Sequence, residues 1–194
     1  MNARCALWSV AVVGGAVGAL LASGCGGDGS GAGGSGGAGG GGANDPFEAN
    51  RQACVDEINT LRATKSLPPL ERWKDAESCV DQQASDDAAS GTAHGAWISG
   101  KYMCNGKGQN ECPGWGADGI VGCLDSMWAE KDQAGCAGCD ACADAYDPSC
   151  PNCDFYGSTS GDVCGHYVNM SAKFVTRVAC GFSSQGGWDA INFD

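Results

Sequence analysis

The chain is poor in histidine and in positive charge. Its 194 residues include 2 histidines, and 11 Lys plus Arg stand against 23 Asp plus Glu, which gives a formal net charge of −12. A surface of that sign repels nucleic-acid backbones and anionic lipids, so we expect no nucleic-acid partner. The His-Glu-x-x-His motif of zinc hydrolases and the regular acidic spacing of a calcium loop are also absent. These absences disfavour the common hydrolase and calcium-binding classes.

Residues 1–24 resemble a bacterial lipoprotein signal peptide. Arg4 precedes an uncharged, mostly apolar run, and small residues follow it directly before Cys25. In that class of protein the cysteine becomes the lipidated N-terminus, so the resemblance implies lipidation at Cys25 and attachment to a membrane. Gly26 favours the outer membrane, because the inner-membrane retention signal usually has aspartate there. The alternative is a plain secretory signal in which Cys25 has no role.

Glycine dominates the next segment. Residues 25–45 are rich in glycine with a few serines and alanines, and such a chain cannot offset the entropy lost on ordering. We interpret it as a flexible tether with a reach of roughly 20–25 Å. Residues 46–194 then form the single folded domain, which is long enough to bury a core of its own.

Cysteine is abundant, with 14 in the chain. Cys5 leaves with the signal and Cys25 takes the lipid, so twelve remain in the domain. An even number in an exported chain predicts up to six disulfides, with the connectivity left open. These twelve are Cys54, Cys79, Cys104, Cys112, Cys123, Cys136, Cys139, Cys142, Cys150, Cys153, Cys164 and Cys180.

Five of these cysteines, between Cys136 and Cys153, form closely spaced C-x-x-C pairs. Paired C-x-x-C motifs are also typical of zinc ribbons. The gap between the pairs is short for a ribbon and a fifth cysteine is left over. We therefore favour disulfides that staple a long loop, with a metal site as the alternative.

The pattern of apolar residues predicts helices first and strands late. Helical spacing covers 47–64, a second stretch from about 73 to 90, and 120–131. Residues 100–119 and 135–162 are predicted loops, and 166–170 and 174–182 have strand composition. This order predicts an α+β layered domain.

The stretch from Gly165 to Gly181, GHYVNMSAKFVTRVACG, carries the most specific signal. It resembles the signature of the CAP superfamily, which includes cysteine-rich secretory proteins, insect venom antigens and plant pathogenesis-related proteins. Further motifs of that family occur in the same order upstream. They are Asn59-x-x-Arg62, His94 after an alanine-spaced helix, Gly108-Gln109-Asn110 and Met127-Trp128-Ala129-Glu130.

The resemblance implies a three-layer α-β-α sandwich, rich in disulfides, with a surface cleft lined by two histidines and two acids. The corresponding residues here are His94, Gln109, Glu130 and His166, and the two histidines would hold a divalent cation such as zinc. Gln109 departs from the family's glutamate, and an amide cannot act as a general base. Glu111, two residues on, is a possible substitute. Without metal, the histidines would organise the cleft through hydrogen bonds to carboxylates.

Three functions remain open at this level. The first is extracytoplasmic binding of a lipid, glycan or protein in the histidine cleft. The second is a weak zinc-dependent hydrolase or peptidase, which we disfavour because Gln109 removes one partner for acid–base chemistry. The third is a structural surface protein with a vestigial cleft. Four aromatic residues in glycine-rich loops pack in the core or, for some of them, line a ligand cleft. They are Trp97, Tyr102, Trp115 and Tyr156.

Overall fold

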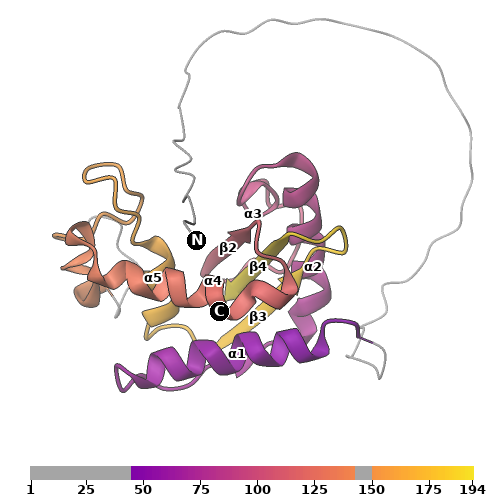
Figure 1. The fold of residues 1–194 in the computed structure, drawn as a ribbon, viewed down its shortest axis with the longest axis horizontal. Helices are drawn as coiled ribbons and strands as arrows, with labels where there is room; N and C mark the ends of the chain where they lie inside the picture. Colours follow the sequence, from indigo (N-terminus) through magenta and orange to yellow (C-terminus); the bar gives the residue numbers. More distant parts are fainter. Residues whose placement is uncertain (1–44, 143–149) are drawn as a thin grey trace, which may run out of the picture. The chain divides into compact units, whose positions relative to one another are not determined.

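The computed structural model describes residues 45–142 and 150–194 (Figure 1). The expected signal segment, the tether and Cys25 therefore lie outside the described residues. Within the described part, no helix is both long enough and apolar enough to cross a membrane. The helices and strands, in chain order, are α1 Glu48–Ala63, β1 Glu71–Arg72, α2 Lys74–Ser90, α3 Gly95–Ile98, β2 Gly108–Pro113, α4 Ile120–Trp128, α5 Gly165–Ser171, β3 Arg177–Phe182 and β4 Trp188–Phe193.

The strands form one mixed sheet of four strands in the order β1-β3-β4-β2. The short β1 runs parallel to β3, while β3 with β4 and β4 with β2 are antiparallel. The strand β2 is therefore an edge strand. Its register sets Gln109 opposite Asn192 and Glu111 opposite Ala190 on β4. The predicted α+β class is confirmed by this mixed architecture.

Helices pack against both faces of the sheet. Successive strand residues point to opposite faces, and on β3 the Cys180 sulfur bonds Cys54 of α1 while the adjacent Ala179 packs with Ala76 and Val80 of α2. The helices α1 and α2 thus cover opposite faces. Small side chains let α2 approach closely: a Cβ added to Gly181 would lie 2.4 Å from the carbonyl carbon of Val80.

The three long helices were predicted close to their observed bounds. On α1 the buried side chains recur at helical spacing; of the apolar residues that predicted the helix, Val55 and Ile58 are among them. The helix α2 ends at Gly91, whose left-handed φ of 66° suits glycine. Residues 120–131 divide into α4 and a following 3-10 turn at Ala129–Asp132.

Residues 166–170 are helical, so the prediction of a strand there is wrong. Nearly all of α5 is buried, including Tyr167, Val168 and Met170. A segment of seven residues is too short for the spacing of its apolar side chains to separate a helix from a strand. Residues 108–113, predicted as loop, form β2 instead, and 188–193 form β4. The strand β2 has no local signal, because it lacks β-branched and aromatic residues, whereas β4 contains Trp188, Ile191 and Phe193.

The prediction of a disulfide-rich domain is confirmed. Five disulfides are described: Cys54–Cys180, Cys79–Cys104, Cys112–Cys123, Cys136–Cys164 and Cys139–Cys153. Cys150 is disulfide-bonded as well. The last two of the five staple the segment between α4 and α5, whose described residues form 3-10 turns at Ala129–Asp132, Ala134–Cys136 and Cys139–Cys142. Disulfides in this number are typical of proteins in oxidising, extracellular surroundings.

Candidate functional site

His94 lies just before α3, beside the edge strand β2. Its backbone has a φ of 60°, in the left-handed region that residues with side chains seldom adopt. The backbone N–H of His94 donates to Glu111 Oε2 at 3.0 Å, and the ring Nδ1 lies 2.9 Å from Gln109 Oε1. Two residues of one strand face thus hold the histidine, one by its backbone and one by its ring.

A chain of buried amides fixes the orientation of Gln109. The Asn192 Nδ2 donates to the Cys104 carbonyl at 2.8 Å and to Gln83 Oε1 at 2.7 Å. Asn192 Oδ1 therefore accepts from Gln109 Nε2 at 3.0 Å. The Gln109 oxygen is left for His94, so Nδ1 carries the proton and Nε2 keeps its lone pair. The expected cleft residue Gln109 thus acts as a hydrogen-bond acceptor that sets a tautomer.

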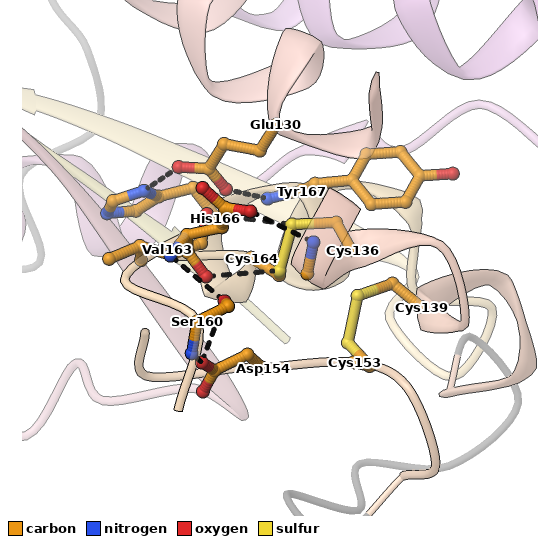
Figure 2. Close-up of a disulfide and its surroundings, with 12 residues drawn as sticks. Glu130, Cys136, Cys139, Cys153, Asp154, Ser160, Val163, Cys164, His166 and Tyr167 are labelled. Atoms are coloured by element: carbon orange, nitrogen blue, oxygen red, sulfur yellow. Dashed lines mark hydrogen bonds and ion pairs between the residues drawn. A yellow bond between two sulfur atoms is a disulfide. The ribbon is translucent and has the colours of Figure 1, made fainter. Parts of the chain in front are cut away.

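His166, in the first turn of α5, pairs with Glu130 from the turn after α4 (Figure 2). Glu130 Oε1 lies 2.6 Å from His166 Nδ1, and Oε2 accepts from the backbone N–H of Tyr167 at 3.0 Å. Both carboxylate oxygens are therefore used to orient the start of α5. As at His94, the Nδ1 of the ring is engaged and Nε2 is left available as a ligand atom.

The edge strand β2 connects the two histidine pairs. Asn110 Nδ2 donates to the His166 carbonyl at 3.1 Å, while the preceding residue, Gln109, contacts His94. Asn169 of α5 donates to the Gln109 carbonyl at 3.1 Å. Burial lowers the pKa of His94, the hydrogen bond that its ring donates to Gln109 opposes this shift, and the charge of His166 adds to it. The two histidine pairs are therefore linked through adjacent residues of β2.

Glu111 does not replace the acid missing at Gln109. It contacts the backbone of His94 and the indole N–H of Trp188, 3.0 Å away, rather than the imidazole ring. Burial, and then a hydrogen bond with Asp87, raise the pKa of Glu111 to about 9. The group is thus protonated at neutral pH, and it acts as a structural hydrogen-bonding group beneath His94.

A pocket of about 270 Å³ opens beside His94. The aromatic side chains of Trp97, Phe155 and Tyr156 line it together with Asn169 and the edge of β2. Lys107 is the one charged residue among the lining residues described. Loop aromatics over a polar floor are typical of small-ligand sites. Of the four loop aromatics that the sequence suggested, Trp97 and Tyr156 line this pocket, whereas Tyr102 and Trp115 do not.

A second group of metal-ligating atoms lies apart from the histidines. The sulfurs of Cys136, Cys139 and Cys164 are buried and lie within 4.8 Å of one another, a spacing that could hold a metal ion. In the structure all three belong to disulfides, whereas a metal requires thiolates. The sulfurs would therefore offer a metal site only after reduction.

Several residues of the site could not be identified from the sequence. Gln83, Asn192 and Asn169 hold the cleft residues in place, but a buried amide has no sequence signal of its own. No family model matches the chain, and no curated protein matches it.

Proposed function

We propose that this chain is an extracytoplasmic binding protein with a CAP-type domain, which takes a lipid, glycan or protein ligand in the pocket beside His94. The helix–sheet–helix arrangement supports the three-layer sandwich of that superfamily. Lipidation at Cys25 and attachment to the outer membrane by the glycine-rich tether are part of the same proposal. The disulfides support export.

The observation that carries the proposal is that both imidazole rings are held in the same way. Each Nδ1 is held by a side-chain oxygen, at 2.9 Å for His94 and 2.6 Å for His166. A hydrogen bond at Nδ1 fixes the orientation and the tautomer of the ring, as in many metal-binding histidines. The two Nε2 atoms would supply the nitrogen ligands for zinc or another divalent cation.

Binding is favoured over catalysis for a chemical reason. A catalytic zinc normally has three protein ligands, and among the described residues neither histidine belongs to a group of three ligating side chains. Both oxygens of Glu130 already accept hydrogen bonds, and Gln109 cannot take a proton. Glu130 and Gln109 are thus occupied in orienting the two imidazoles, so neither is left as a second acid–base group beside them.

Calorimetric titration with zinc at neutral pH tests the metal part. We expect one weak site in the wild type and a loss of affinity of about tenfold or more in His94→Ala and in His166→Ala. Lys131→Ala, a substitution of a side chain paired with Asp132 outside the cleft, is the control and should bind as the wild type does. Equal affinities in all four proteins would remove the histidine site.

Mass spectrometry of small molecules retained by the natively purified protein tests the ligand. A lipid or saccharide that is retained by the wild type and lost in Trp97→Ala supports the binding role. Hydrolysis of peptide or ester libraries that His166→Ala abolishes would instead establish an enzyme. A surface phenotype insensitive to both substitutions would indicate a structural protein with a vestigial cleft.

A further inference from the structure

Two disulfides lie against each other in the segment between α4 and α5 (Figure 2). The sulfur of Cys139 is within 4.8 Å of both sulfurs of the Cys136–Cys164 bond. Cys136 and Cys139 form a C-x-x-C motif, yet each is bonded to a more distant cysteine. A C-x-x-C pair can also close on itself, so an alternative disulfide requires only a local exchange of partners.

The two disulfides differ in their access to solvent. Cys153 is 7% exposed and lines a pocket of about 450 Å³, whereas its partner Cys139 is fully buried. The Cys136–Cys164 bond does not line that pocket, and its sulfurs belong to residues that are 3% and 0% exposed. A thiol from solvent therefore meets the Cys139–Cys153 bond from the Cys153 side. Cys150 lines the same pocket and is a second point of attack.

The charge of this pocket selects among thiols. Among the described residues that line it, Asp154 is the one with a charged side chain. Hydrogen bonds from Ser160, Thr159 and Ser158 lower the pKa of Asp154 to about 2, so the carboxylate is ionised at neutral pH. The chain as a whole carries −12. A cationic thiol is attracted to such a pocket and an anionic one is repelled.

We propose that Cys153 is an S-thiolation site for small cationic thiols, and that the reaction passes through Cys139 to the buried Cys136–Cys164 disulfide. The external thiolate attacks the Cys153 sulfur, and Cys139 leaves as a thiolate. Cys139 then attacks Cys136 or Cys164, and the other sulfur of that bond leaves and takes a proton. One external thiol is consumed, one mixed disulfide forms and one protein thiol appears, with no net oxidation.

The end of this relay lies beside the His166–Glu130 pair in the sequence. Cys164 immediately precedes α5, whose second residue is His166, and Cys136 follows the turn that holds Glu130. Opening the Cys136–Cys164 bond would release the link between the two segments that carry this pair. The chemistry itself is independent of the proposed function, because it needs neither metal nor ligand.

A single substitution tests the internal step without any added thiol. Cys153→Ser leaves Cys139 as a thiol beside the Cys136–Cys164 bond, and we expect spontaneous exchange. Acid quenching, unfolding, alkylation and peptide mapping should then find a fraction of the alkylated thiol at Cys136 or Cys164. Alkylation confined to Cys139 would overturn the relay. The matched control, Cys123→Ser, should leave its free thiol at Cys112, which lies outside the sulfur cluster.

The external step is tested on the wild-type chain with cysteamine and with mercaptopropionate at equal thiolate concentration. We expect the cysteamine adduct at Cys153 to form about tenfold faster than the mercaptopropionate adduct, and a free thiol at Cys136 or Cys164 to follow it. In Cys139→Ser/Cys153→Ser, the Cys136–Cys164 bond should open about tenfold more slowly. Adducts confined to Cys150, or equal opening rates in both proteins, would overturn the proposal.

Discussion

Removal of the disulfide between Cys54 and Cys180 should cost more stability than removal of the one between Cys112 and Cys123. The first closes a separation of 126 residues and the second a separation of 11. A cross-link restricts the unfolded chain more when the loop is longer, and the chain-entropy relation gives about 5 and about 3 kcal/mol. The expected difference is therefore about 2 kcal/mol for isolated loops.

The other disulfides reduce this difference. Cys79–Cys104, Cys112–Cys123 and Cys136–Cys164 all lie within the long loop and shorten its effective length to roughly half. Each halving lowers the closure cost by about 0.6 kcal/mol, so about 1.5 kcal/mol remains. Burial is matched, because all four cysteines of the two compared pairs are 0–2% exposed and their replacement leaves similar cavities.

Urea unfolding of Cys54→Ala/Cys180→Ala and Cys112→Ala/Cys123→Ala measures the difference directly. We expect the first variant to be less stable by about 1.5 kcal/mol, and the m-value of each to exceed that of the wild type because its unfolded state is less compact. Equal stabilities, or the reverse order, would refute the assignment of this stabilisation to chain entropy.

Three further substitutions probe the interior. Arg62 is 1% exposed and donates to the Met170 and Ala172 carbonyls at the end of α5, so Arg62→Met should lose about 2–4 kcal/mol in urea unfolding; a loss below 1 kcal/mol would contradict this. Burial raises the pKa of Asp189 to about 7 from 3.8, so the folded state retains a proton that the unfolded state releases, and stability should fall as pH rises from about 4 to 7. Asp189→Asn should flatten that slope in thermal melts across pH, and an unchanged slope would exclude Asp189 as its source. Gly181→Ala should lower the free energy of unfolding by about 1–3 kcal/mol, since the added Cβ would overlap the α2 backbone. A thermal midpoint equal to that of the wild type would show that α2 can move aside.

The long helices and the disulfide-rich character could be predicted because their signals are local or compositional. The buried positions of α1 repeat at helical spacing, and the even number of cysteines indicates pairing without indicating the partners. The helix α5 could not be recognised, since it has only seven residues and nearly all of them are buried, the polar Asn169 and Ser171 included. The strand β2 was missed because its residues are mostly polar, and only their pairing with β4 places them in the sheet.

The sequence by itself identified the candidate residues, namely His94, His166, Glu130, Gln109 and the cysteines. Tertiary structure alone decided what they do. It set the tautomer of His94 through the Gln109 amide, protonated Glu111 by burying it against Asp87, and placed the sulfur of Cys139 beside a second disulfide. Proton positions, pKa values and disulfide-exchange partners depend on burial and on distances between groups that are far apart along the chain, so they cannot be read from local sequence.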